Sequence, residues 1–436
     1  MLRRLIGVFS VAGIALVAAS LVVAGRFNWF INSFETTDAL LELAGKALLA
    51  FLLILIARYL TLLTFSTVEI WRYARKPVYP SKYPTVTLIM PAMNEGPVIE
   101  NSIRSAMALD YPSYEVIVVD DGSSDDTYEK AARLAAEYGS NRLRVFTQQN
   151  RGKSAALNTG IAHARGELVV CTDSDSRLNA ESLWRMARHF ENPEVVAVAG
   201  NVRVVNRGNL ITKLQALEYV EGLNLVRTAQ ALFGCMTVIP GPVGMFRKSV
   251  LREVGGYLSD TFAEDCDLTL RIVVHGGRIE YEPKAIAFTE APERTKALFR
   301  QRYRWGRGIL QALIKHRVEL LRPWRMRTWV LLATLGFECV VLPSLNLLGV
   351  VLLVITMLGG VSSLGLLWWA GLTMLDVAVA LYCVAREREQ LALVFYAIFY
   401  RLFFVMYVDT VRFFAWVDEM FDVRMSWMRM ARLGRI

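Results

Sequence analysis

The chain has 436 residues, 54% of them hydrophobic, and a mean hydropathy of +0.35, which is too apolar for an ordinary soluble protein. Its net charge of +9 is compatible with nucleic-acid binding. The basic residues cluster beside hydrophobic segments, however, so we assign them to a membrane surface and expect no nucleic acid. The five cysteines are scattered without metal-ligand spacing and give no sign of a disulfide framework.

The first elements of the chain are apolar. Residues 5–24 and 40–65 are each long enough to span a bilayer, so residues 1–76 are predicted to form two transmembrane helices. Lys46 and Arg58 lie toward the ends of the second helix, where long side chains can extend to the interface. The first stretch also fits a signal peptide cleaved near residues 18–20, and the second would then remain as an anchor.

The next part of the chain, residues 84–292, has the alternating pattern of a single α/β domain. Helices are expected at 97–108, 125–138 and 153–164, between strands at 85–90, 115–119, 143–147, 168–172 and 195–199. This alternation predicts a mainly parallel sheet with flanking helices. There is no GxGxxG after the first strand and no GxxxxGK[ST], so neither a Rossmann dinucleotide site nor a P-loop is supported.

The last third of the chain is basic at first and then apolar. Residues 293–327 are predicted to form amphipathic interfacial helices, and residues 328–420 three or four transmembrane or interfacial helices. Residues 328–359 are either one tilted helix or two helices broken at Pro343, and residues 364–385 are a clear span. The segment 391–416 carries charges that we expect to face a bundle or a polar path, namely Arg401, Asp409 and Arg412. The alternative is that this segment lies in the membrane interface.

Basic flanks predict the orientation in the membrane. Arginines and lysines gather at residues 3–4, 72–76 and 322–327, and two N-terminal spans would return the chain to the cytoplasm, so the α/β domain is expected to be cytoplasmic. The tail, residues 421–436, is also basic. If it is cytoplasmic too, the number of C-terminal spans must be even, which favours a break at Pro343.

Acidic residues follow two predicted strands of the sheet. Asp120 and Asp121 end one strand, and the Asp173–Asp175 segment ends another. Because open α/β sheets bind ligands at the carboxyl ends of their strands, these acids predict a site for a nucleotide and a divalent cation. In the segment 150–154, Lys153 begins a helix after a glycine turn, which suits a phosphate; the alternative is an ordinary helix start with a solvated lysine.

Four motifs in order resemble those of a family 2 glycosyltransferase of the GT-A fold. They are Asp120-Asp121-Gly122, Asp173-Ser174-Asp175, Glu264-Asp265 and Gln301-Arg302-Tyr303-Arg304-Trp305. Within this family the chain is most similar to the processive, membrane-embedded branch of poly-N-acetylglucosamine, hyaluronan, chitin and cellulose synthases. Stretches such as 150–153, 200–203 and 263–269 look closest to the bacterial poly-β-1,6-N-acetylglucosamine synthases. Ala263 replaces the usual threonine, and Gly241-Pro242 looks more like hyaluronan and chitin synthases.

The resemblance implies roles at the donor end of a site. Asp173 and Asp175 would hold a divalent cation, Mg²⁺ or Mn²⁺, which suits hard oxygen ligands. Asp120 and Asp121 would hold the base and ribose of the nucleotide, although one of the pair can instead cap the turn. The other predicted donor-binding residues are Asn94, Glu95, Lys153 and Arg304, and Asp173 is assigned to donor binding as well as to the cation. Arg304 would neutralise the leaving diphosphate.

The resemblance also implies roles at the acceptor end. Asp265 is the candidate general base, with Glu264 as its positioning neighbour, because none of the four histidines lies in a motif. The alternative role for Asp265 is an N-cap of the following helix, which is compatible with catalysis. Gln301, Arg304 and Trp305 share one helix face, and Trp305 can stack on the acceptor sugar. Gln301, Trp305, Gly241 and Pro242 are therefore the predicted acceptor-binding residues.

These features predict a processive inverting glycosyltransferase in the bacterial inner (plasma) membrane. Its donor would be a UDP-sugar, with UDP-N-acetylglucosamine as first choice, and its partners the growing polysaccharide, membrane lipid and a small membrane or periplasmic accessory subunit. One alternative is a non-processive enzyme that makes a glycolipid or a lipid-linked sugar, and another is a hyaluronan- or cellulose-type synthase with a different UDP-sugar. A third is a transport or scaffold protein with an inactive transferase domain, against which the intact carboxylate set argues.

Overall fold

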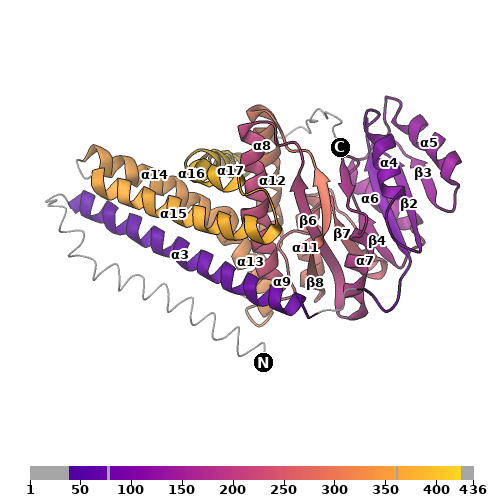
Figure 1. Ribbon diagram of the computed structural model, residues 1–436, viewed down its shortest axis with the longest axis horizontal. Helices are drawn as coiled ribbons and strands as arrows, with labels where there is room; N and C mark the ends of the chain where they lie inside the picture. The colour runs from indigo at the N-terminus through magenta and orange to yellow at the C-terminus, as the bar shows by residue number, and fades with distance from the viewer. Residues whose placement is uncertain (1–38, 76–78, 360–361, 424–436) are drawn as a thin grey trace.

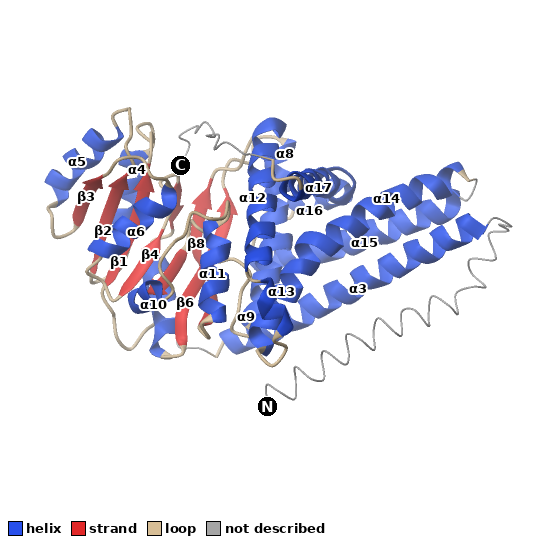
Figure 2. Ribbon diagram, turned by 180° about the vertical axis from the view of Figure 1, so that it is seen from behind, coloured by secondary structure: helices blue, strands red, loops and turns tan. Residues whose placement is uncertain are grey.

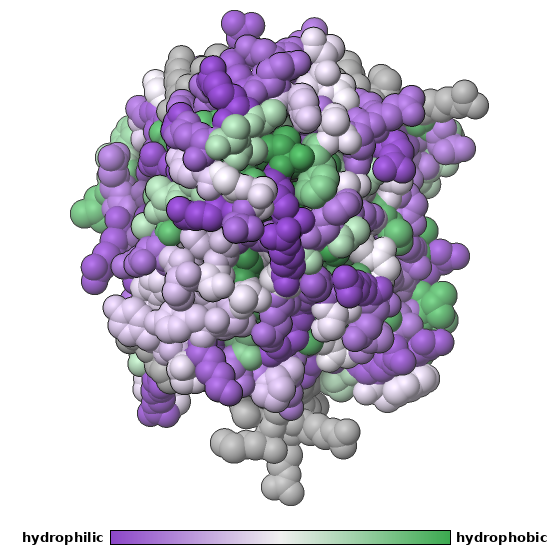
Figure 3. Space-filling model, turned by 90° about the vertical axis from the view of Figure 1, so that its right-hand side faces the viewer, coloured by the Kyte–Doolittle hydropathy of each residue, from purple (hydrophilic) through white to green (hydrophobic). Residues whose placement is uncertain are grey.

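The computed structural model describes residues 39–75, 79–359 and 362–423 (Figure 1). The predicted span or signal peptide at residues 5–24 and nearly all of the basic tail lie outside the described residues. An α/β domain occupies one end of the molecule and long helices occupy the other, with a layer of helices between them. The outer end of the α/β domain, away from the long helices, is largely hydrophilic (Figure 3).

The α/β domain is built on one mixed sheet, which has eight strands in the described residues (Figure 2). Their order is β3-β2-β1-β4-β7-β6-β8-β5, and β3, β2, β1 and β4 are mutually parallel. β7 runs antiparallel to β4 and β6, β8 is parallel to β6, and β5 is antiparallel to β8. The strands are β1 (Val86–Ala92), β2 (Tyr114–Asp120), β3 (Leu143–Thr147), β4 (Leu168–Cys171), β5 (Ser176–Leu178), β6 (Val195–Val204), β7 (Gly244–Arg247) and β8 (Arg278–Thr289).

Helices cover both faces of this sheet, so its central strands are buried on both sides. On β1, Leu88 and Met90 pack into one hydrophobic cluster while Ile89 packs into the cluster on the opposite face, as the two-residue period of a strand requires. The helices of the domain are α4 (Ile99–Met107), α5 (Thr127–Tyr138), α6 (Lys153–His163), α7 (Ser182–Ala187), α10 (Lys248–Glu253) and α11 (Glu264–Val274), with a short 3₁₀ helix η1 (Arg188–Glu191).

The sequence pattern predicts the first half of the domain and misses much of the second. The five expected strands correspond to β1, β2, β3, β4 and β6, and the three expected helices to α4, α5 and α6. The fold class, a mainly parallel sheet with flanking helices, is confirmed. The strands β5, β7 and β8 were not predicted, because they are short or, in β8, interrupted by the charged Glu280–Lys284 stretch.

A layer of helices lies between the sheet and the long helices. One part is a continuous helical segment made of α8 (Leu210–Leu217), the π turn η2 (Glu218–Asn224) and α9 (Leu225–Ala231). It begins at a capping box, in which Asn209 Oδ1 accepts a hydrogen bond from Thr212 N at 2.9 Å. The other part is α12 (Thr295–Lys315), followed by the 3₁₀ helix η3 (Arg317–Leu321).

The long helices include four that are long and apolar enough to span a membrane, as expected of an integral membrane protein. These segments are Leu41–Tyr73, Met326–Leu358, Gly365–Glu387 and Leu393–Met420. The corresponding elements are α3 (Ala39–Tyr73), α13 (Met326–Gly336) with the π turn η4 (Phe337–Val341) and α14 (Leu342–Leu358), α15 (Ser362–Glu387), and α16 (Leu393–Phe399) with the π turn η5 (Tyr400–Val405) and α17 (Met406–Met420).

The chain is not broken into two helices at Pro343, which corrects the favoured sequence interpretation. α13, η4 and α14 form one continuous helical segment, and Pro343 stands in the first turn of α14. The preceding π turn already departs from regular α-helical hydrogen bonding, so the missing N–H of a proline is tolerated there.

The last long helix lies across the others. In Figures 1 and 2, α16 and α17 are seen almost end-on, whereas α3, α14 and α15 run along the page. This orientation favours the interface alternative for residues 391–416 over a span parallel to the other helices.

Charged side chains of the long helices face one another, as predicted for Arg401, Asp409 and Arg412. Arg401 Nη2 lies 2.6 Å from Asp376 Oδ1, and Asp409 accepts hydrogen bonds from Asn346 at 2.7 Å and from Arg412 at 3.0 Å. Arg58 does not extend to the interface: its guanidinium forms two 2.7 Å hydrogen bonds with Glu338. Arg58 and Glu338 thus neutralise each other inside the bundle.

Candidate functional site

A cavity of about 1340 Å³ joins the α/β domain to the long helices. Its wall contains thirteen of the fourteen predicted site residues: Asn94, Glu95, Asp121, Lys153, Asp173, Asp175, Gly241, Pro242, Glu264, Asp265, Gln301, Arg304 and Trp305. It continues to residues of α3, α14 and α17, including Arg58, Asn346 and Arg412. The motifs that lie far apart in the sequence therefore meet in one space.

Asp120 is the predicted residue that does not line this cavity. It is buried at the end of β2, where its carboxylate accepts hydrogen bonds from Thr147 Oγ1 at 3.0 Å and from Ser123 N at 3.3 Å. It therefore caps the turn after β2, which is the alternative left open for one member of the aspartate pair.

Asp121 lines the cavity and holds a neighbouring loop. Its carboxylate accepts hydrogen bonds from the backbone N–H groups of Arg151 at 3.0 Å and Gly152 at 2.8 Å. Gly152 has a φ of +90°, which favours glycine, and α6 begins directly after it. Asp121 thus fixes the loop that carries Lys153 into the cavity.

Asn94 and Glu95 form the edge of the cavity beyond β1. Asn94 has a φ of +54°, a left-handed conformation that asparagine tolerates. Its side-chain oxygen accepts a hydrogen bond from Ser124 N at 2.7 Å, and its own N–H donates to Ser123 Oγ at 2.8 Å. Glu95 N donates to Thr127 Oγ1 at 2.8 Å. These bonds tie the loop after β1 to the loop after β2.

Lys153 lies between two of the acidic motifs. Its Nζ is 2.6 Å from Asp173 Oδ1 and 3.4 Å from Glu264 Oε1. Burial lowers the pKa of Lys153, but the nearby carboxylates outweigh burial and raise the pKa above its usual value, so the amine stays charged. The cation therefore joins the Asp173–Asp175 segment to the Glu264–Asp265 pair.

The acids at the end of β4 fit a cation that arrives with a ligand. Asp173 and Asp175 both line the cavity. Within the described ranges, no group of three or more His, Cys, Asp or Glu side chains is arranged to hold a metal ion. Mg²⁺ commonly takes one or two carboxylates and completes its shell with phosphate oxygens and water. Two carboxylates thus suit a cation bound together with a nucleotide diphosphate.

Asp265 begins α11 in the cavity wall, beside Glu264. Burial, with the charge of Glu264, raises the pKa of Asp265 to about 6, although Lys153, the Cys266 N–H and Arg304 oppose the rise. The Cys266 N–H donates to its carboxylate at 2.8 Å. A carboxylate with a pKa close to neutral can accept a proton and release it again, as a general base must.

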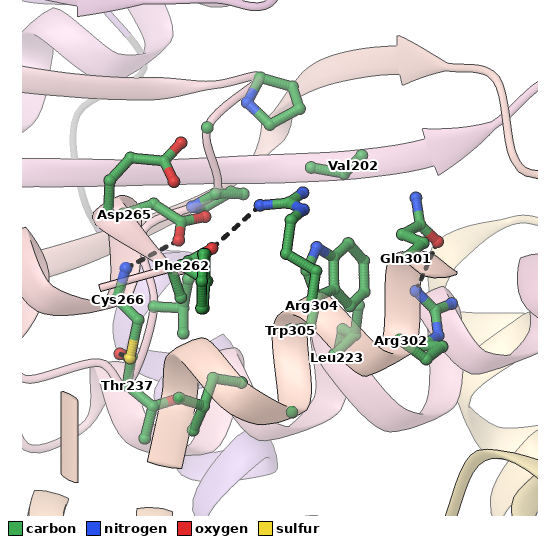
Figure 4. Close-up of a pocket in the computed structure, with 18 of the residues that line it drawn as sticks. Val202, Leu223, Thr237, Phe262, Asp265, Cys266, Gln301, Arg302, Arg304 and Trp305 are labelled. Carbon is green, nitrogen blue, oxygen red and sulfur yellow. Dashed lines mark hydrogen bonds between the residues drawn. The ribbon is translucent and has the colours of Figure 1, made fainter. Parts of the chain in front are cut away.

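One face of α12 presents the last motif to the same space (Figure 4). Arg304 Nη1 donates a 3.0 Å hydrogen bond to Phe262 O, which places its guanidinium near Asp265. Gln301 Oε1 accepts from Arg302 at 2.8 Å, and the Arg302 guanidinium lies over the Trp305 ring at 4.2 Å from its centroid. Trp305 thus keeps a fixed position in the cavity wall.

Gly241 lies nearer to the predicted donor-binding acids than its predicted acceptor role requires. A Cβ atom at this position would lie 3.2 Å from Lys153 Nζ and 3.6 Å from Asp173 Oδ2. Glycine therefore allows the chain before β7 to approach the Lys153–Asp173 pair closely.

The sequence interpretation missed the contribution of the α8–α9 segment. Glu218 forms an ion pair with Arg302, and Glu221, Arg227 and Gln230 also line the cavity. In the described part of the chain, Glu221 Oε2 and Gln230 Nε2 are buried without a hydrogen-bond partner, so they are available to a polar ligand. The available signal was the Asn209–Thr212 helix start followed by two glutamates in an apolar run.

Comparison with known proteins agrees with this geometry. Residues 87–255 match the family model described as glycosyl transferase family 2. The chain is 31% identical over 248 residues to the poly-beta-1,6-N-acetyl-D-glucosamine synthase of Staphylococcus aureus (strain COL), covering 57% of this chain and 60% of that protein. The synthase of Staphylococcus epidermidis is 30% identical over 250 residues, with the same two shares. The match thus spans 60% of the length of these relatives.

A solved structure has the same fold. A mannosyltransferase from Pyrobaculum calidifontis, in complex with GDP-Man and Mn²⁺, superposes with a TM-score of 0.62 and 23% identity, covering 86% of this chain and 99% of that chain. The α/β domain therefore has a GT-A-like fold, and it is joined to long apolar helices. Residues 87–255 carry the match to glycosyl transferase family 2, and the rest of the chain lies outside that match.

The raised pKa of Asp265 predicts how sugar transfer depends on pH. A general base works only when deprotonated, so kcat/KM should fall about tenfold for each pH unit below about 6. Glu264→Gln removes a negative charge that raises the pKa of Asp265, so its acid limb should move to lower pH. Initial rates measured from about pH 4.5 to about pH 8.5 test this. An acid limb near the ordinary aspartate pKa of about 4 in the parent protein would contradict the assignment.

Proposed function

We propose that the chain is a processive inverting glycosyltransferase that polymerises a UDP-sugar, first UDP-N-acetylglucosamine, and passes the polysaccharide across the membrane. One observation carries the proposal. The cavity that holds the acidic motifs continues between the long helices, so a product formed beside Asp265 has a path toward the membrane. The similarity to poly-N-acetylglucosamine synthases supports the choice of sugar.

The residues of the site suit the two halves of the reaction. The bond between the anomeric carbon and the diphosphate oxygen breaks, and a bond from that carbon to the acceptor oxygen forms with inversion. Asp265 accepts the proton of the acceptor hydroxyl, and Arg304 with Lys153 stabilises the charge of the departing UDP. A divalent cation, Mg²⁺ or Mn²⁺, held by Asp173 and Asp175, would supply further charge stabilisation when bound; the Mn²⁺ of the mannosyltransferase structure with the same fold supports this.

The charge balance of the cavity favours a carbohydrate acceptor over an anionic lipid phosphate. Four of the arginines in its wall are matched by acids, in the pairs Arg58–Glu338, Arg401–Asp376, Arg412–Asp409 and Arg302–Glu218. Arg227, also buried in the wall, donates a 3.4 Å hydrogen bond to Asn224 Oδ1. A paired guanidinium has little charge left for a phosphate, whereas the pairs and the buried Glu221 and Gln230 can still exchange hydrogen bonds with hydroxyl groups.

The proposed orientation places the transferase domain at the cytoplasmic side of a bacterial plasma membrane. UDP-sugars are made in the cytoplasm, and the basic flanks of the long helices support this side. α12 and α16–α17 would lie in the interface, in contact with lipid headgroups. A small accessory subunit at the far side of the helices is part of the proposal.

The deciding experiment is UDP release by purified membranes, screened over several UDP-sugars. Transfer from UDP-N-acetylglucosamine, with a long product that a linkage-specific glycosidase degrades, is the expected result. Long products from another UDP-sugar would correct the sugar. A product of a single sugar on a lipid would contradict processivity, and no UDP release at all would favour an inactive domain.

The metal proposal predicts loss of activity on chelation. Excess EDTA should abolish sugar transfer, and Mg²⁺ or Mn²⁺ should restore it. Without the cation, the negative charges of the diphosphate and of the two carboxylates would repel one another. Asp175→Asn should be inactive at any metal concentration. UDP release is the measurement, and full activity in excess EDTA would contradict the metal site.

Loss of the general base should lower sugar transfer without a comparable loss of nucleotide affinity. Asp265→Asn should lower sugar transfer by at least ~10², the usual scale for a general base, while UDP affinity stays within a few-fold. The two quantities are measured by UDP release and by equilibrium binding of UDP. A variant that loses UDP affinity but keeps its turnover at saturation would place Asp265 in the donor site.

Substitutions of two motif residues on α12 should have different effects on the reaction. Trp305→Ala removes a ring contact worth about 1 kcal/mol, so polymer synthesis should collapse to short products or donor hydrolysis while UDP binding survives. Arg304→Ala removes a charge near the leaving group, so every form of UDP release should fall. Product length on a gel and UDP release separate these outcomes. Full-length polymer at normal rate from both variants would contradict the acceptor assignment.

A further inference from the structure

One face of α12 holds the chain segment that carries the candidate base. Arg304, Gly308, Gln311 and Lys315 follow one another at spacings of four, three and four residues, which places them along a single helical face. Arg304 donates to Phe262 O at 3.0 Å, and Gln311 Oε1 accepts from Phe262 N at 3.0 Å. Both polar groups of the Phe262 backbone are thus bound by this face.

The same face leaves no free space at Gly308. A Cβ atom on this glycine would lie 2.3 Å from Ala263 N, so the helix and the segment before Glu264 are in direct backbone contact. At the end of the face, Lys315 adds an ion pair, since its Nζ lies 2.8 Å from Asp267 Oδ1. The base segment therefore follows any movement of α12.

Gln311 also binds the helix on the other side of α12. Its Nε2 donates to Glu419 Oε1 at 3.0 Å and to Oε2 at 3.1 Å, and Arg307 Nε donates to the same carboxylate at 2.7 Å. The orientation of the amide follows from its partners, because a backbone N–H needs an acceptor and a carboxylate needs a donor. One side chain thus connects α17 to the backbone of Phe262.

We propose that Gln311 is a positioning residue that fixes Asp265 relative to Arg304 by linking the base segment to α17. Asp265 depends on this support, because in the described residues its carboxylate accepts one hydrogen bond, from the adjacent Cys266 N. A base must be held at hydrogen-bonding distance from its substrate, and a displacement of about 1 Å can cost ~10²-fold in rate. The inference rests on the proposed transfer reaction for its kinetic consequences.

The test replaces Gln311 by leucine in the full-length protein and compares it with Tyr303→Phe. Tyr303 also joins α12 to α17, through a 2.5 Å hydrogen bond to Asp418, but it is not among the described residues that line the cavity. Gln311→Leu should lower kcat about ten- to a hundredfold with KM for the UDP-sugar nearly unchanged. Its acid limb should move to lower pH, because water that reaches Asp265 reverses the effect of burial. Tyr303→Phe should change neither.

A paired exchange supplies the rescue. Gln311→Glu alone places two carboxylates together and should be as slow as Gln311→Leu. Combined with Glu419→Gln, residue 311 again accepts from Phe262 N and residue 419 donates to it, so most of the rate and the pH profile should return. Equal losses in Gln311→Leu and Tyr303→Phe, or a double variant no faster than Gln311→Glu, would overturn the proposal.

Hydrogen exchange tests the link without any enzymatic assay. The Phe262 amide, which donates to Gln311, should exchange faster in Gln311→Leu than in the parent or in Tyr303→Phe. Unchanged exchange would overturn the positioning role. Failure of the parent to transfer any sugar would instead contradict the proposed function, and exchange at Phe262 would then decide the link by itself.

Discussion

The pairing of buried charges is the constraint on which this structure depends. A cavity lined by guanidinium and carboxylate groups lies among apolar helices, where a lone charge is costly. Arg401 and Asp376 illustrate the rule, since the aspartate is fully buried and only 2.6 Å from its partner. Removing one member of such a pair costs about 3 to 5 kcal/mol, because the other is left buried without a partner. The cavity can therefore be polar without being strongly charged.

The charge pairs also differ between the two ends of the cavity, the deep end among the long helices and the end beside Lys153 in the α/β domain. At the deep end, three of the four pairs join different helical segments and so hold the bundle together, whereas Arg412–Asp409 lies within α17. At the proposed donor end, Lys153 contacts both Asp173 and Glu264 and is partly exposed, so a ligand can replace one of these contacts without leaving a charge alone. A diphosphate with its cation brings charges of both signs. The donor end is thus suited to exchange partners during a reaction, and the deep end is not.

The sequence predicted the part of the fold that local patterns determine. The acids after β2 and β4 lie at the carboxyl ends of parallel strands, and this placement follows from alternating strands and helices alone. The different roles of Asp120 and Asp121 did not follow, because adjacent residues on a strand point to opposite sides and only the fold shows which side is the cavity. The α8–α9 segment was missed for a related reason: Glu218 and Glu221 become site residues only when distant helices enclose them.

The path of the last helices offers another answer to the question of how many times the C-terminal part of the chain crosses the membrane. A cytoplasmic tail needs an even number of C-terminal spans, and a break at Pro343 was one way to obtain it. In the structure, the helical segment α13–α14 leads away from the α/β domain and α15 leads back to it. The end of α15 contacts the domain, since Arg203 near the end of β6 donates a 2.8 Å hydrogen bond to Glu387 O. α16–α17 then lies across the bundle and ends at α12, where Arg307 binds Val423 O. The number of C-terminal crossings is thus even without a break if α16–α17 lies in the interface, as its orientation favours.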